Sequence, residues 1–190
     1  MKLFLILVCV AALLSGCGSG KSSENAVKPL ALMPRAESEP EWAIRVVNRF
    51  LRPLNNDLRV VNGLHDPTVV VYITNQNKTT LSVVDKGLAD LEQCRNKLLV
   101  IGPPPPQSGP FERVYKEFKA ACIGYVPMAK TLRKAVLFWS SGRADVIPRG
   151  YPTLRSTAHV ANVAGDHYAA GIRIAQGLPE FRRAGLKPSV

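Results

Sequence analysis

Apolar runs of four to six residues alternate with amphipathic segments along most of this chain. The runs predict strands, and they lie at 29–33, 58–61, 68–73, 98–101 and 135–139. Apolar residues three and four positions apart predict helices between the strands, at 40–51, 83–91, 111–121 and 168–176. The mostly β-branched run 68–73 is typical of a strand buried on both faces. We therefore expect an α/β fold, a three-layer flavodoxin-like domain with a mostly parallel sheet of about five strands.

The amino terminus has the pattern of an export signal. Lys2 precedes an unbroken apolar run at 3–14, and small residues follow the run. A run of this length is too short for a membrane-spanning helix, which needs about 20 residues. Leu14-Ser15-Gly16-Cys17 resembles the bacterial lipobox. The resemblance implies cleavage after Gly16, lipid on the Cys17 thiol and acylation, as by palmitate, of the new amino terminus.

This resemblance divides the chain into three parts. Residues 1–16 are expected to be a lipoprotein signal peptide, and 17–28 the lipidated cysteine and a tether rich in Gly, Ser and Lys. Residues 29–190 are expected to form a single α/β domain. Gly18 stands where inner-membrane lipoproteins usually have Asp. The implied location is the cell envelope, on the outer membrane facing the periplasm if the host is Gram-negative.

The chain is strongly basic, with a formal charge of +11. Removal of residues 1–16 takes away one lysine and leaves +10 (11 − 1). Basic surfaces attract phosphates and other anions, so we expect the membrane, an anionic lipid or glycan, or an envelope protein complex as partner. Aromatic residues are not interleaved with the basic ones, so nucleic acid is not expected. A generally cationic, solvated surface is the alternative.

Two cysteines remain after Cys17 is assigned to lipid and Cys9 to the signal peptide. In an oxidising compartment, Cys94 and Cys122 are expected to form a disulfide, with two buried free thiols as the alternative. No Cys/His cluster has the spacing of a zinc site. Neither a metal nor a cofactor is expected.

Four segments of the mature chain resemble the SGNH/GDSL hydrolases, which are small flavodoxin-like esterases. They are a helix containing Trp42, the segments 60–63 and 99–105, and the closing segment 166–175. Such enzymes transfer an acyl group through a serine, which a base activates while fixed donors stabilise the oxyanion. The resemblance implies catalytic roles for Ser38, Asp166 and His167. It implies an oxyanion hole formed by Gly63 and by either Asn75 or Asn77.

The match to this family has three departures. Ala36 stands at the expected nucleophile position, and the Asn75 loop lacks the family's usual form. In the family the aspartate lies three residues before the histidine, whereas Asp166 is directly adjacent to His167. Ser38 also suits the cap of a helix beginning near Pro40, and Asp166 the cap of a helix beginning at His167. Asn75 and Asn77 suit turns, and Arg35, Arg143, Arg149 and Arg155 suit either an anion site or solvated loops.

Two functions follow from these observations. The first is a membrane-anchored envelope lipoprotein whose degenerate SGNH-like domain is a non-catalytic binding or assembly component. The alternative is an SGNH-type esterase or acyl hydrolase that acts on envelope lipid or glycan esters. The missing family serine favours the first function.

Overall fold

The computed structural model describes residues 31–187, and these residues form helices and loops only. Helix accounts for 77% of the residues described, and this part of the chain contains no strand. The predicted three-layer α/β domain with a parallel sheet is therefore wrong. The predicted signal peptide 1–16 and the whole of the predicted tether 17–28, Cys17 included, lie outside the residues described.

The helices follow one another through short connections. The amino-terminal half contains α1 (Glu39–Val46), one π-helical turn η1 (Val47–Leu51), α2 (Arg52–Gly63), α3 (Pro67–Thr74), α4 (Lys78–Glu92) and α5 (Cys94–Ile101). The carboxyl-terminal half contains α6 (Pro110–Trp139), the 3₁₀ turn η2 (Ile147–Arg149), α7 (Gly150–Ser156), α8 (Ala158–Gly177) and α9 (Pro179–Arg183). The elements α1, η1 and α2 run on without a break as one long helical segment.

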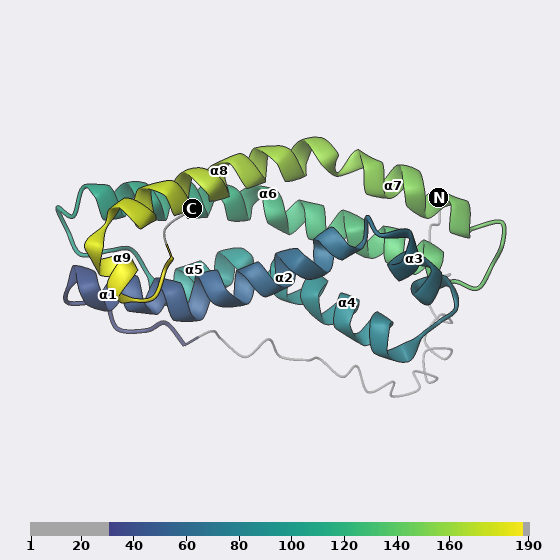
Figure 1. Ribbon diagram of the computed structural model, residues 1–190, viewed down its shortest axis with the longest axis horizontal. Coiled ribbons are helices and arrows are strands. Elements are labelled where there is room, and N and C mark those ends of the chain that lie inside the picture. The colour runs from purple at the N-terminus through teal and green to yellow at the C-terminus, as the bar shows by residue number, and fades with distance from the viewer. Residues whose placement is uncertain (1–30, 188–190) are drawn as a thin grey trace, which may run out of the picture.

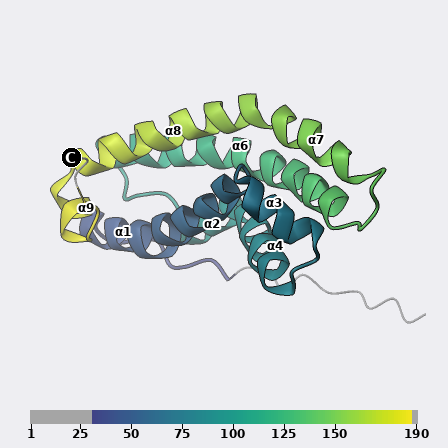
Figure 2. The ribbon, with the colours of Figure 1, turned by 45° about the vertical axis from the view of Figure 1, so that its right-hand side comes forward.

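Helix α6 lies in the middle of an elongated bundle (Figure 1). Helices α7 and α8 return along one side of it, while α2, α4 and α5 lie along the other side. Figure 2 shows α3 and α4 at the end of the bundle opposite to α9. Because α6 contacts helices from both halves of the chain, it organises the core.

The 68–73 run forms helix α3 and not a strand. Asp66 caps the helix, since its carboxylate accepts a hydrogen bond of 2.8 Å from the Thr68 amide, and Pro67 occupies the first turn. Val70 and Ile73 are buried three residues apart, whereas Val71 and Tyr72 are about half exposed. This burial pattern has the period of a helix, and the Asp66-Pro67 cap overrides the strand preference of the β-branched residues.

Three other runs predicted as strands, 58–61, 98–101 and 135–139, are also parts of helices, whereas residues 31–33 of the run 29–33 lie in the loop before α1. In α5 the buried side chains are Cys94, Leu98 and Ile101, which lie four and three residues apart. In the last turns of α6, Ala135, Val136 and Trp139 are buried. Each contiguous apolar run therefore combines buried positions of a helix with more exposed apolar neighbours.

Helix α6 joins the predicted helix 111–121 to the predicted strand 135–139 in one continuous element. It continues through Pro127, although proline cannot donate a helical hydrogen bond and leaves the Ile123 carbonyl without its usual partner. Both residues are exposed, so water can bind this carbonyl. A loop at 102–109 precedes α6, and it begins at Gly102 with a positive φ of 77° that suits glycine.

Helices α6 and α8 approach each other closely at two glycines. A Cβ atom on Gly171 of α8 would lie 2.6 Å from the buried ring of Phe118, and one on Gly124 of α6 would lie 2.7 Å from the Ala164 side chain. At one end, Trp42, Phe111 and Phe181 pack ring against ring with centroids 5.9–6.1 Å apart. The long contact between α6 and α8 therefore depends on the absence of a side chain at Gly124 and Gly171.

We expect Gly171→Ala to lower the free energy of unfolding by about 1–3 kcal/mol, because the new methyl group overlaps the Phe118 ring. Gly165→Ala on the same helix is the matched control, since nothing lies within 4 Å of its added Cβ. It should raise stability by about 0.5–1 kcal/mol through helix propensity. Denaturant unfolding of the two variants measures the difference. Equal stabilisation by both substitutions would contradict the close packing of α6 on α8.

Candidate functional site

The three residues expected to form a catalytic triad have other roles in this structure. Ser38 caps α1, and its hydroxyl oxygen accepts a hydrogen bond of 3.4 Å from the Glu41 amide. His167 lies inside α8, where its Nδ1 shares a hydrogen bond of 2.7 Å with Glu117. Asp166 is exposed on α8, eight residues after the helix begins at 158, so it is not a helix cap. Within residues 31–187, no hydrogen bond joins any two of these three side chains.

The expected oxyanion residues lie at helix ends. Gly63 is the last residue of α2, Asn75 follows the last residue of α3, and Asn77 precedes α4. The Asn77 side chain caps α4 by accepting a hydrogen bond of 2.9 Å from the Thr80 amide. The roles implied by the SGNH/GDSL resemblance require strand ends that meet at one edge of a sheet, and the described chain has no sheet.

The four arginines considered for an anion site are placed separately. Arg35 donates a hydrogen bond of 2.9 Å to the Pro104 carbonyl, beside the 102–109 loop. Arg143 pairs with Asp145 at 2.8 Å in the connection after α6. Arg149 and Arg155 are exposed on η2 and α7. Among the residues described, no group of three His, Cys, Asp or Glu side chains could hold a metal ion.

A disulfide joins Cys94, the first residue of α5, to Cys122 in the middle of α6. Their Cα atoms are 5.4 Å apart, and both side chains are buried. Of the two alternatives that the sequence leaves open, the structure thus contains the bonded pair. The bond closes a loop that includes the prolines at 103–106, and it fixes α5 on α6.

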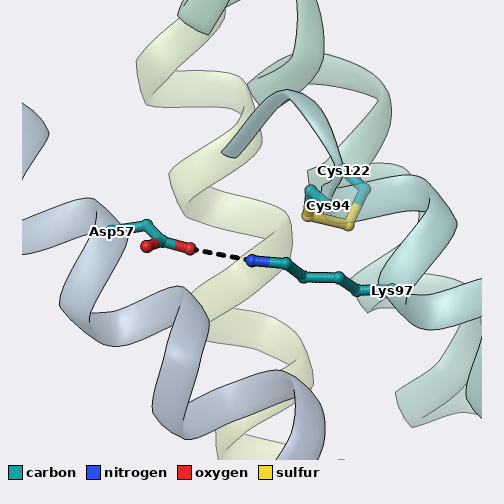
Figure 3. The surroundings of a disulfide bond; sticks show 4 residues. All are labelled: Asp57, Cys94, Lys97 and Cys122. Carbon is teal, nitrogen blue, oxygen red and sulfur yellow. Dashed lines mark hydrogen bonds and ion pairs between the residues drawn. A yellow bond between two sulfur atoms is a disulfide. The ribbon is translucent and has the colours of Figure 1, made fainter. Parts of the chain in front are cut away.

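An ion-pair network beside the disulfide connects three helices. The Lys97 ammonium of α5 lies 3.3 Å from a carboxylate oxygen of Asp57 on α2 and 3.3 Å from one of Asp90 on α4. Figure 3 shows Lys97 reaching Asp57 from the helix that also carries Cys94. Burial raises the pKa of Asp57 above its ordinary value of 3.8, and the Lys97 charge offsets this rise only in part.

A second ion-pair network connects α6 to α4. Arg133 lies 3.2 Å from an Asp85 oxygen and 3.0 Å from a Glu92 oxygen. The Glu92 contact is also a hydrogen bond from Nε of Arg133. These pairs place four carboxylates of α2 and α4, those of Asp57, Asp85, Asp90 and Glu92, against only two cations. Acidic side chains are therefore concentrated on this side of α6.

The exposed side of α6 has the opposite charge. Its exposed residues recur three or four positions apart, as expected for one face of a helix. We name the following row the α6 ridge: Lys116, Lys119, Ile123, Pro127, Lys130, Lys134 and Leu137. The ridge contains four lysines and no acidic residue, and none of the four lysines forms an ion pair within the described residues. Glu112, in the first turn of α6, precedes the ridge on the same face.

A shallow depression lies beside the amino-terminal part of the α6 ridge. It is lined by Arg95, Leu98, Leu99, Tyr115, Lys119 and Cys122. Arg95 and Lys119 supply two cations from different helices, while Leu99 is about half exposed and adds apolar surface. The depression has a volume of only about 10 Å³, which is too small to enclose a substrate.

A polar contact between α2, α6 and α8 lies apart from the ridge. The Tyr168 hydroxyl donates a hydrogen bond of 2.7 Å to the Asn55 side chain. Burial raises the pKa of Tyr168 to about 12, although the bond to Asn55 opposes this rise. The neighbouring His167–Glu117 pair is partly exposed. These groups hold helices together, and neither pair contains a serine, threonine or cysteine nucleophile.

The sequence contains a signal for the α6 ridge, although none of the predicted site residues belongs to it. The ridge lysines recur at a helical spacing from 116 to 134, but the prediction of a helix at 111–121 and a strand at 135–139 hides their common face. Arg95 lies beside the α6 ridge only because α5 packs against α6, and this packing is seen in the structure and not in the sequence.

The double substitution Cys94→Ala with Cys122→Ala should lower the free energy of unfolding by about 3–4 kcal/mol. The reason is that the disulfide closes a loop of 28 residues in the unfolded chain. Denaturant unfolding with and without a thiol reductant measures the effect. Reductant should destabilise the wild type and leave the double variant unchanged. A wild type insensitive to reductant under denaturing conditions would show that the bond is absent or without effect.

The raised pKa of Asp57 predicts a pH dependence of stability. The folded state binds the Asp57 proton more tightly than the unfolded chain, so this group contributes stability fully below pH 3.8. The contribution is lost as the pH rises through the raised pKa. Asp57→Asn removes the titration and keeps a similar shape. The stability of wild type relative to this variant should fall between about pH 3 and about pH 7 in urea unfolding. A relative stability that rises over this range would contradict the desolvation of Asp57.

Comparison with known proteins adds no assignment to this geometry. The chain matches no protein-family model, no curated protein and no solved structure. The features of the chain that bear on its function are the amino-terminal motif, the α5–α6 pair fixed by the disulfide, and the cationic α6 ridge.

Proposed function

We propose that this protein is an envelope lipoprotein, anchored through lipid on Cys17, whose helical domain is a non-catalytic binding or assembly component. The observation that carries the proposal is the motif Leu14-Ser15-Gly16-Cys17 directly after the apolar run 3–14. Two or three acyl chains hold a protein on a membrane far more strongly than one chain does. No helix among residues 31–187 is long and apolar enough to cross a membrane.

The absence of an organised reaction centre in the described chain supports a binding role. Ser38 caps a helix, His167 pairs with Glu117, and the depression beside α6 is shallow. Ester hydrolysis needs a nucleophile within hydrogen-bond reach of its base. No observation specifically favours the ester-hydrolase alternative, so the binding role is the single proposal.

The charge of the domain indicates the kind of partner. Residues 31–187 contain 22 Lys and Arg and 13 Asp and Glu residues, a net charge of +9. Only four of the 22 cations lie in ion pairs, those of Arg45, Lys97, Arg133 and Arg143. The remaining cations leave a field that attracts anionic surfaces. An anionic component of the envelope is therefore the expected partner of the domain.

Cys17→Ala should abolish lipid attachment, because the lipobox cysteine supplies the acceptor thiol. The measurement is incorporation of radiolabelled palmitate into the full chain in a bacterial host, together with its recovery in the membrane fraction. Cys9→Ala is the matched control, since Cys9 lies in the apolar run and outside the motif. It should keep both the label and the membrane association. Palmitate incorporation that survives Cys17→Ala would contradict the proposed anchor.

A further inference from the structure

The α6 ridge combines charged and apolar residues in an arrangement that solvation alone does not require. Ile123 and Leu137 are 61% and 62% exposed, among the most exposed large hydrophobic residues of the described chain. They alternate with pairs of lysines on the same face of one helix. Isolated exposed apolar residues are common on proteins, but here they share a face with unpaired cations.

The acidic residues of α4 that pair with α6 are turned away from the ridge, although Glu112 of α6 lies one turn before it on the same face. Asp85 and Glu92 of α4 are held by Arg133, which lies beside the ridge residue Lys134 in sequence but points to α4. Opposite charges are thus paired between α4 and α6, while the exposed face of α6 keeps its lysines free of partners within the described chain. This separation leaves a cationic strip along most of a 30-residue helix.

Helix α5 widens the strip at its amino-terminal part. Arg95 and Leu99 are one turn apart on α5, and both line the depression that Lys119 borders from α6. The disulfide of Cys94 with Cys122 lies directly beneath and fixes the two helices. Two cations from different elements therefore face one shallow, partly apolar depression in a fixed geometry. Their charges can contact a phosphate group at the rim of this depression, which is itself too small to hold one.

We propose that the α6 ridge, together with Arg95 and Leu99, lies on the anionic phospholipid surface of the membrane that holds the lipid anchor. This inference rests on the proposed function. Lysine stems and the side chains of Ile123 and Leu137 enter the headgroup region, while the ammonium groups bind lipid phosphates. From 116 to 137 the ridge spans about 32 Å, so the helix lies along the membrane plane.

The predicted tether makes this contact geometrically accessible. Eleven residues, 18–28, separate Cys17 from the start of the predicted domain. Even fully extended, they span at most about 40 Å, so an anchored domain stays close to the lipid headgroups. Confinement of this kind raises the effective concentration of a weak surface contact.

The experiment measures how fast each lysine of the full, lipidated chain is acetylated in vesicles, by mass spectrometry. One vesicle preparation contains phosphatidylcholine alone, and the other an equimolar mixture with phosphatidylglycerol. Lys116, Lys119, Lys130 and Lys134 should react several-fold more slowly in the anionic vesicles, and added salt should restore their reactivity. Lys86 of α4, whose charge acts on Asp57 of α2, is exposed elsewhere and should react equally in both.

Variants separate the ridge from general charge. Lys119→Gln with Lys130→Gln should remove most of the protection of Lys116 and Lys134. The control Lys78→Gln with Lys86→Gln removes the same charge from exposed positions of α4 and should leave the protection unchanged. Ile123→Gln should weaken the protection without changing the charge. All these positions are exposed, so the variants should fold as the wild type does.

Several results would overturn the inference, and they are distinguishable from failure of the anchor. Lipidated protein whose ridge lysines react equally in both vesicle types would leave the anchor intact and overturn the ridge contact. Equal protection by inorganic phosphate or by a soluble acidic polysaccharide would assign the ridge to those anions in place of the membrane. Protection that depends on protein concentration in neutral vesicles would assign it to a second copy of the chain. Protein that carries no palmitate would overturn both proposals.

Discussion

The packing of the other helices around α6 is the constraint on which the rest of the structure depends. Twelve residues of this helix are buried, from Phe111 at its start to Trp139 at its end. Helices from both halves of the chain contact it, and α8 comes close enough that Gly171 has no room for a side chain. A helix surrounded on so many sides has only one exposed face, and that face is the α6 ridge.

The disulfide and the ion pairs fix the positions of the helices along one another, which hydrophobic packing alone does not fix. The disulfide holds α5 against the middle of α6, and Lys97 on the same short helix connects to α2 and α4. Arg133 joins α4 to α6 in the same way. Because these contacts pair acidic side chains of α2 and α4 with Lys97 and Arg133, the ridge lysines remain without acidic partners in the described chain. This pairing of charges between helices leaves the cationic surface on which the proposed membrane contact depends.

The sequence predicted some local features and missed the fold class. Ser38 suited a helix cap and is one, and Cys94 and Cys122 suited a disulfide and form one. The error came from contiguous apolar runs, which read as buried strands. In 68–73 the cap formed by Asp66 and Pro67 was the signal for a helix, and burial with helical period decided the outcome.

The candidate site was predicted even less well, for a related reason. The SGNH/GDSL resemblance depended on the order of loops between supposed strands, and it drew together residues that lie at unrelated helix ends, such as Gly63 and Asn77. The α6 ridge required recognition of 110–139 as one helix despite Pro127. Proline usually ends a helix, but on an exposed face water satisfies the carbonyl that loses its donor.

Far-UV circular dichroism of the full chain in a mild detergent tests most directly whether helices alone form this domain. We expect a spectrum dominated by α-helix, because 77% of residues 31–187 are helical and none of them lies in a strand. A spectrum with about a fifth of the residues in strands, as in an ordinary α/β domain, would contradict it. That result would also remove α6 as the support of the proposed membrane-facing surface.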